Sequence, residues 1–191
     1  MRAIRIVAVA VMGAVTLALA GCASAGGDAA PGDSSGANAV ATPQPASDAL
    51  TADDALAADL LFIIEEEKLA HDVYIALNDV WDARIFANIS RAETQHGENM
   101  AALLDAYGLD DPRSDQEGVF VDATLQALYD DLVASGSESW EAAVQAGITV
   151  EETDIADLTE TLQDAPDDVR IVLERLLAGS QRHLEAFTRQ A

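Results

Sequence analysis

The fold is decided by one stretch, Ile89-Ser90-Arg91-Ala92-Glu93-Thr94-Gln95-His96-Gly97-Glu98-Asn99-Met100. Its apolar side chains recur every three or four positions, which predicts a helix with one buried face. That face carries Phe86, Ile89, Glu93, His96, Met100, Leu103 and Tyr107. Glu93 and His96 lie three apart, one above the other, inside an otherwise apolar stripe. A buried carboxylate is costly unless it is paired or bound to a metal, so the pair predicts a polar site in a helical core.

The same spacing recurs in three further long segments, and no convincing alternating strand appears. We expect main helices from Thr51 to about Asp79, at 83–107, at 138–163 and from Pro166 onward. The connection between the second and third of them is long and contains a short amphipathic helix at about 123–134. Such a connection lets those two helices run parallel, as in bundles with one crossover. The predicted fold class is therefore an all-α four-helix bundle.

Each long helix carries a polar residue that can bind metal in the middle of its apolar stripe. These residues are Glu67, Glu93 with His96, Glu151, and His183. Left unpaired in one core, they would destabilise the fold by several kcal/mol. Two divalent metals roughly 3.5 to 4 Å apart would neutralise them, with bridging carboxylates and one imidazole on each metal. The imidazoles must then be neutral, so metal affinity should fall as the pH drops.

Several neighbouring residues compete for places in this site. Glu152 competes with Glu151, because a modest rotation of the helix would exchange them. Asp154 is three residues after Glu151 and can share its face. His71 is interpreted as a partner of Glu67 or Asp72 rather than as a ligand. Tyr74 is either a core aromatic or a hydrogen-bonding or radical residue beside the metals, while Glu65 and Glu66 are placed nearer the edges of the stripe.

The first fifty residues predict export rather than fold. Arg2 and Arg5 precede an apolar run that ends at Leu19-Ala20-Gly21-Cys22, the layout of a signal peptide. We expect residues 1–21 to be a lipoprotein signal, Cys22 to be lipidated, residues 22–50 to form a flexible tether, and 51–191 to form the domain. The alternatives are an ordinary secretory signal cut near Ala25, or a single membrane span. The lipoprotein interpretation makes this a cell-envelope protein whose domain lies outside the cytoplasm.

The composition restricts the partners. The chain of 191 residues carries a formal net charge of −24. Phosphates would repel such a surface, so we expect no nucleic-acid partner. Cations are the natural counterpart, although acidity also keeps an exported protein soluble.

Several motifs carry a resemblance to known families. Glu67-Lys68-Leu69-Ala70-His71-Asp72-Val73-Tyr74 and Glu93-Thr94-Gln95-His96-Gly97-Glu98 resemble the ligand motifs of ferritins and rubrerythrins. More closely, four segments resemble the bacterial domain-of-unknown-function 2202 family, a member of the ferritin-like superfamily. These segments are Glu65-Glu66-Glu67-Lys68-Leu69-Ala70, Asn88-Ile89-Ser90-Arg91-Ala92-Glu93, Leu125-Gln126-Ala127-Leu128-Tyr129-Asp130 and Gly179-Ser180-Gln181-Arg182-His183-Leu184.

The resemblance implies a ferritin-like bundle with Glu67, Glu93, His96, Glu151 and His183 as metal ligands. One departure matters, because rubrerythrin-type sites have a Glu three residues before the last His, and this chain has Ser180 there. Asp154 or His71 could supply the missing ligand; otherwise the site holds one metal, or two with more water.

The sequence supports three alternative hypotheses about function. The leading hypothesis is an exported, ferritin-like protein that binds iron, with manganese or zinc as alternatives, and oxidises Fe(II) or reduces dioxygen or peroxide. The second is a metal-binding module without turnover. The third is a metal-free structural or interaction bundle at the cell envelope. The expected partners are metal ions and, through Cys22, the membrane, with a second copy or another envelope protein as open possibilities.

Overall fold

The computed structural model describes residues 50–191. The predicted signal peptide, Cys22 and all but the last residue of the predicted tether lie outside the described residues. Within 50–191, no helix is long and apolar enough to cross a membrane. The account that follows therefore concerns the predicted domain.

Five helices form the described part of the chain, which contains no strand. They are α1 (Asp54–Trp81), α2 (Arg84–Tyr107), α3 (Ala123–Gly136), α4 (Trp140–Thr161) and α5 (Asp167–Thr188). The all-α prediction is confirmed, with helix limits within a few residues of those expected. The start of α1 differs, because the Asp53 carboxylate rather than the Thr51 hydroxyl accepts from the first free amides, those of Ala55 and Leu56.

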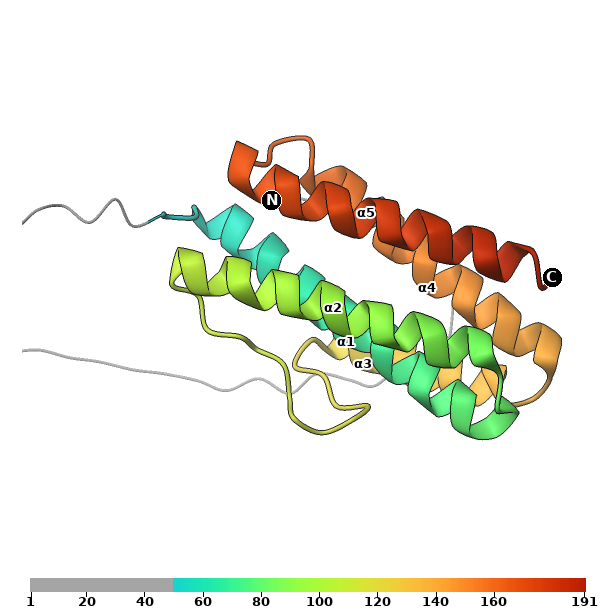
Figure 1. Ribbon diagram of the computed structural model, residues 1–191. Helices are drawn as coiled ribbons and strands as arrows, with labels where there is room; N and C mark the ends of the chain where they lie inside the picture. The colour runs from blue at the N-terminus through green and yellow to red at the C-terminus, as the bar shows by residue number, and fades with distance from the viewer. Residues whose placement is uncertain (1–49) are drawn as a thin grey trace, which may run out of the picture. The chain divides into compact units, whose positions relative to one another are not determined.

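The long connection has the predicted consequence for topology. α1 and α2 form one antiparallel pair and α4 and α5 form another, and α2 and α4 run in the same direction (Figure 1). Residues 109–122 and α3 make the crossover between the two pairs. α1 packs against α2, α3 and α4, while α5 packs against α4 and α2. α1 is therefore covered on more sides than a helix at the edge of a bundle.

The apolar core is divided into two clusters, one towards each end of the bundle. One cluster contains Val73, Tyr74, Leu77, Phe86, Val150 and Phe187 among its members. The other contains Leu60, Ile63, Ile64, Met100, Leu104, Leu158, Leu173 and Leu176 among its members. Each of the four long helices contributes to both clusters, and between the two clusters each helix carries inward polar side chains. The core is thus interrupted by a layer of charged and polar side chains.

Two sequence predictions about helix faces were wrong. Glu65 and Glu66, which the spacing placed nearer the edges of the α1 stripe, are as buried as its centre, with 3% and 4% of their surface exposed. On α4 the spacing of Val144, Ile148, Glu151, Ile155 and Leu158 predicts one buried stripe, but Ile148 and Ile155 are only half-buried, whereas Val150, which lies off that stripe, is buried. Both errors have one cause, since α1 and α4 each pack against three other helices and have more than one covered face.

Candidate metal centre

The polar layer is built from eight side chains on the four long helices. It consists of Glu66 and Glu67 from α1, Glu93 and His96 from α2, Glu151 and Asp154 from α4, and Ser180 and His183 from α5. The carboxylates of Glu67, Glu93 and Glu151 are 1–2% exposed, and the two imidazoles are 11% and 12% exposed. The structure therefore brings together all five residues that the sequence proposed as ligands.

Glu93 lies between the two imidazoles. Its Oε2 is 2.7 Å from Nδ1 of His96, and its Oε1 is 2.7 Å from Nδ1 of His183. Each imidazole also faces a second carboxylate: Oε2 of Glu67 lies 3.2 Å from His96 Nδ1, and Oε2 of Glu151 lies 3.7 Å from His183 Nδ1. The two rings are stacked, with centroids 5.6 Å apart and planes inclined by 27°.

These contacts define two donor groups that share one residue. Glu67, Glu93 and His96 form the first group, and Glu93, Glu151 and His183 form the second. In each group the three ligand atoms lie within 4.8 Å of one another. Two ligands of one metal at about 2.1 Å can be up to roughly 4.2 Å apart. The donor atoms need only small movements to enclose an ion in each group.

Unsatisfied atoms provide an independent test of whether a metal fits. Buried polar atoms are nearly always hydrogen bonded. Among residues 50–191, the buried side-chain atoms that have no hydrogen-bond partner are Oε2 of Glu66, Oε1 of Glu67, Oε1 of Glu93, Oδ1 of Asp154 and Nδ1 of His183. All of them belong to the polar layer. The donor set of carboxylates and imidazoles therefore fits a cation that would satisfy these atoms.

The pKa shifts in the layer without metal also indicate that its buried carboxylates need additional positive charge. Burial raises the pKa of Glu67 well above its ordinary value, and Asp154 adds to the effect. Burial also raises the pKa values of Glu151 and Asp154, each to about 7. Burial opposes charge on His96, but Glu67 and Glu93 outweigh it and raise its pKa to about 10. In the absence of metal, protons carry the positive charge that the carboxylates require.

Further contacts hold the donors in place. Tyr74, in the middle of an aromatic cluster, donates from its hydroxyl to Oε1 of Glu151 at 2.5 Å. Ser180 donates from its hydroxyl to Oδ2 of Asp154, also at 2.5 Å. A Cβ at Gly179 would lie 2.4 Å from Cε1 and Nε2 of His96. Glycine at this position therefore leaves the space that the His96 ring occupies.

The structure shows which of the residues that competed for places in the site lie in the polar layer. Glu151 points inward with 1% exposure, whereas Glu152 is exposed. His71 lies outside the layer, and its Nδ1 is 2.8 Å from Oδ1 of Asp72. Sequence reasoning missed Glu66, which is buried among acids of the layer. The only sequence signal for it was its place in the run Glu65-Glu66-Glu67.

The three successive acids on α1 point in different directions and make different contacts. Glu65 accepts from the backbone amides of Val121 and Asp122 at 2.7 and 2.9 Å, which fixes the part of the crossover that leads into α3. Burial raises the pKa of Glu66 well above its ordinary value, and Asp154 and Asp157 on α4 add to the effect. Glu67 faces His96 on α2. Glu65 thus holds the crossover, Glu66 faces α4, and Glu67 belongs to the first donor group.

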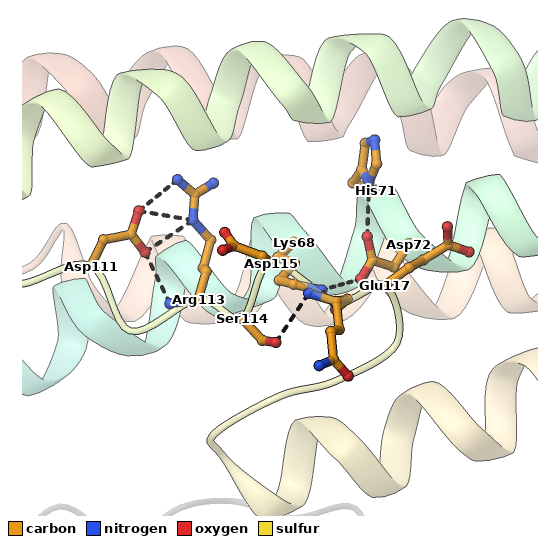
Figure 2. A pocket seen from close by; sticks show the side chains of 9 residues that line it. Lys68, His71, Asp72, Asp111, Arg113, Ser114, Asp115 and Glu117 are labelled. Atoms are coloured by element: carbon orange, nitrogen blue, oxygen red, sulfur yellow. Dashed lines mark hydrogen bonds and ion pairs between the residues drawn. The ribbon is translucent and has the colours of Figure 1, made fainter.

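A surface pocket lies apart from the polar layer. It has a volume of about 420 Å³ and lies between α1 and the crossover (Figure 2). Its lining residues are Lys68, His71, Asp72, Asp111, Arg113, Ser114, Asp115, Gln116 and Glu117. Its charges are largely paired, because Lys68 binds Asp72 and Arg113 binds Asp111. No member of the polar layer lines it.

The fold and the layer define a class: a helical bundle with a buried carboxylate and imidazole centre. The chain belongs to the family of the Uncharacterized protein domain (DUF2202), whose model matches residues 57–191. It is 39% identical over 132 residues to Uncharacterized protein MJ0754 of Methanocaldococcus jannaschii, covering 68% of this chain and 71% of the relative. The crystal structure of hypothetical protein MJ0754 is similar, with a TM-score of 0.72 and 36% identity, covering 74% of this chain and 82% of that chain.

Proposed function

We propose that this protein binds two transition-metal ions in the polar layer, and that Glu93 bridges them. One observation carries the proposal: the two oxygens of Glu93 face different imidazoles, each at 2.7 Å. One ion would be held by Glu67, Glu93 and His96, and the other by Glu93, Glu151 and His183. Each ion would therefore receive one imidazole nitrogen, one terminal carboxylate and one shared carboxylate.

Iron is the metal we propose, with manganese and zinc as the alternatives. Mixed carboxylate and imidazole ligands suit these ions, whereas the described residues offer no thiolate that would select softer metals. Pairs of such donors projecting from four helices are also the pattern of di-iron carboxylate bundles, which supports a ferritin-like assignment. Bound iron would supply one-electron chemistry between Fe(II) and Fe(III), with Fe(II), dioxygen or peroxide as substrates. The chain's own contribution is a rigid donor set between two apolar clusters that limit access of water.

The test is metal content. Purified protein from cells grown with ample iron should contain about two iron atoms per chain by elemental analysis, and a Glu93→Ala/His96→Ala variant should lose them. About one metal per chain would indicate a mononuclear binding module instead. A folded wild-type protein that binds no iron, manganese or zinc would refute the proposal. Consumption of dioxygen or peroxide with added Fe(II) then separates an oxidase from a protein that only binds metal.

We also propose that the domain is exported and held at the cell envelope by lipid on Cys22. The support is the order of Arg2 and Arg5, an apolar run and Leu19-Ala20-Gly21-Cys22. Mass spectrometry of the mature N-terminus would show a diacylglyceryl-modified cysteine. A free N-terminus beyond Cys22, or an intact leader, would refute the lipid anchor without affecting the metal proposal.

A further inference from the structure

A continuous line of aromatic rings joins the polar layer to one end of the bundle. Tyr74, whose hydroxyl donates to Glu151, contacts Phe86 with ring centroids 6.1 Å apart. Phe86 contacts Trp140 at 6.0 Å, and Trp140 contacts Trp81 at 6.3 Å. We call Tyr74, Phe86, Trp140 and Trp81 the aromatic path. Its members come from α1, α2 and α4, so the packing of the bundle assembles it.

The two ends of the aromatic path differ in exposure. Tyr74 and Phe86 are fully buried, whereas Trp81 and Trp140 are half-buried. The tryptophans lie where α1 turns into α2 and α4 begins (Figure 1). The indole N–H of Trp81 donates to the Gly136 carbonyl at 2.9 Å, which holds the outermost ring in place. The aromatic path therefore runs from the protein surface to a hydroxyl that contacts a carboxylate of the layer.

The proposed chemistry of the layer requires electrons from outside. Reduction of peroxide to two water molecules consumes two electrons and two protons, and reduction of dioxygen consumes four of each. Two Fe(II) ions supply two electrons in total. The carboxylates of the two donor groups are only 1–2% exposed, so a large electron carrier cannot contact them. A layer that reduces these substrates repeatedly must receive electrons across the interior of the protein.

The ends of the aromatic path have the chemistry that such a transfer needs. Ring contacts alone do not show it, since centroids roughly 4.5–7 Å apart are ordinary for packed aromatic pairs. Tryptophan and tyrosine lose one electron far more readily than phenylalanine, and both tryptophans of the chain stand at the outer end. The inner end is a phenol that already donates to a carboxylate, and this carboxylate can take the proton that an oxidised phenol releases.

The surface around the two tryptophans is negatively charged. Four exposed carboxylates lie next to them in the chain, near the end of α1 and the start of α4: Asp79, Asp82, Glu138 and Glu141. Arg84 is an exposed cation in the same region. An interface with aromatic side chains at its centre and charges at its rim selects a partner of opposite charge. The carrier that fits this end of the bundle is therefore positively charged.

We propose that the aromatic path delivers electrons to the metal pair from a positively charged one-electron carrier that docks at Trp81 and Trp140. The inference rests on the proposed function for the destination of the electrons. In each step Tyr74 gives one electron to the layer while its phenolic proton passes along the hydrogen bond to Glu151. The neutral tyrosyl radical then takes one electron from the carrier through Trp140 and regains the proton. The carrier is oxidised by one electron, and the aromatic path returns to its starting state.

The test injects an oxidising event at the surface of metal-free protein. The probe is the cation ruthenium tris-bipyridine, which a flash of light and an irreversible electron acceptor convert to a one-electron oxidant. Every variant also carries Tyr107→Phe/Tyr129→Phe, so that Tyr74 is the one tyrosine left. Mildly alkaline buffer keeps the Glu151 carboxylate ionised. Transient absorption and freeze-quench EPR distinguish tryptophanyl from tyrosyl radicals.

We expect the tryptophanyl radical to decay as a Tyr74 radical appears at the same rate, because a tyrosine that can pass its proton to a base is oxidised more readily than tryptophan. Trp140→Phe keeps an aromatic ring in the core and should lower the yield of the Tyr74 radical tenfold or more, with the radical persisting on Trp81. Tyr74→Phe should leave tryptophanyl radical alone.

Docking of a cation is tested with two pairs of variants of equal charge. Asp82→Asn/Glu141→Gln removes two carboxylates beside the tryptophans and should slow their oxidation by the cationic probe about twofold or more. Asp105→Asn/Glu174→Gln removes two exposed carboxylates elsewhere, on α2 and α5, and should leave the rate close to that of wild type.

The outcomes separate this inference from the proposed function. Tryptophanyl radicals that never yield a Tyr74 radical would overturn the aromatic path, and so would an unchanged yield in Trp140→Phe. Equal rates for the two pairs of acid variants would overturn docking of a cationic carrier at this end. None of these results involves metal, so the proposed function would stand. If wild type binds no metal, the proposed function fails, and the destination of the electrons fails with it even where radical transfer is observed.

Discussion

Nδ1 of His183 lies 2.7 Å from Oε1 of Glu93 without completing a hydrogen bond. A donor and an acceptor this close would normally align. Here both atoms are buried and both remain unsatisfied. Two ligands of one metal have this relationship, because their lone pairs point at the ion and not at each other. The contact joins α2 to α5, and with Glu67 and Glu151 it links all four long helices.

The shared position of Glu93 predicts an unequal loss of metal among variants that remove one carboxylate each. Glu93→Gln should reduce bound metal from about two ions to about none, because it removes a ligand from both donor groups. Glu67→Gln and Glu151→Gln each remove a ligand from one group and should leave about one ion. Equilibrium dialysis followed by elemental analysis measures the counts. A Glu93→Gln protein that keeps one full equivalent would show that the carboxylate is not shared.

Removal of metal should destabilise the fold. A ligand at about 100 times its Kd stabilises the folded state by about 2.7 kcal/mol per site, and two sites would add roughly twice that. The metal-loaded protein should therefore melt several degrees or more above the chelated protein in scanning calorimetry. His96→Ala/His183→Ala serves as the control, and its melting temperature should not respond to metal. An equal response in that variant would place the bound metal elsewhere.

The helices and the inward residues proposed as ligands were accessible from the sequence because each depends on one helix at a time. Spacing of three and four residues identifies a face, and Glu67, Glu93 and His96 lie on such faces. The choice between Glu151 and Glu152 was not accessible, because it depends on how α4 is rotated against its neighbours. Packing against α1, α3 and α5 decides that rotation, and the sequence of α4 alone does not determine it.

Burial of Glu65 and Glu66 was inaccessible for a related reason. An isolated amphipathic helix has one buried face, and three successive acids cannot all lie on it. The crossover covers a second side of α1 through the bond of Glu65 to the Val121 amide, and α4 covers a third side at Glu66. The sequence also contains Ser180 and Asp154, but it does not show the 2.5 Å hydrogen bond that joins them across α4 and α5.

Space beside His96 should be required for metal binding. In Gly179→Ala the new methyl group would overlap the imidazole, whose Cε1 and Nε2 lie 2.4 Å from the Cβ position. The ring must then rotate or shift, which should weaken metal binding by tenfold or more and lower stability by about 1–3 kcal/mol. Gly136→Ala is the matched control, since the atoms nearest its Cβ would belong to Leu77 and Ala146 in the apolar core. It should lose stability with unchanged metal affinity, as measured by calorimetric titration.

The Tyr74 hydroxyl should tune Glu151, which is proposed as a terminal ligand. Tyr74→Phe removes the 2.5 Å hydrogen bond and leaves Oε1 of Glu151 without a donor. Loss of such a supporting bond typically costs 10- to 100-fold in metal affinity, and we expect a loss in that range. Tyr107→Phe removes a comparable bond to Asp168, 2.8 Å long and outside the layer, and should bind metal normally. Equal affinities for the two variants would show that the Tyr74 bond serves packing alone.

Asp72 should make the anchoring of the crossover sensitive to acid. Its Oδ1 is 2.8 Å from Nδ1 of His71, and Oδ2 accepts from the Gly118 amide at 2.9 Å and from Lys68. Burial opposes the charge, but His71, Lys68 and the Gly118 amide outweigh it and hold the pKa of Asp72 below its usual range. A carboxylate with a lowered pKa in the folded state stabilises that state above its unfolded pKa of about 3.9. The contribution is lost as the pH falls through the folded pKa.

Asp72→Asn should therefore lower the free energy of unfolding by about 1.5–3 kcal/mol near neutral pH. The difference from wild type should shrink below about pH 4 and nearly vanish once Asp72 is protonated in both states. Urea denaturation across this range measures it, with chelator present so that acid release of metal does not contribute. Asp131→Asn, at an exposed position of α3, should show no such difference. A difference between wild type and Asp72→Asn that stayed constant down to pH 2 would mean that the Asp72 charge does not anchor the crossover, because only a charge-dependent contribution is lost on protonation.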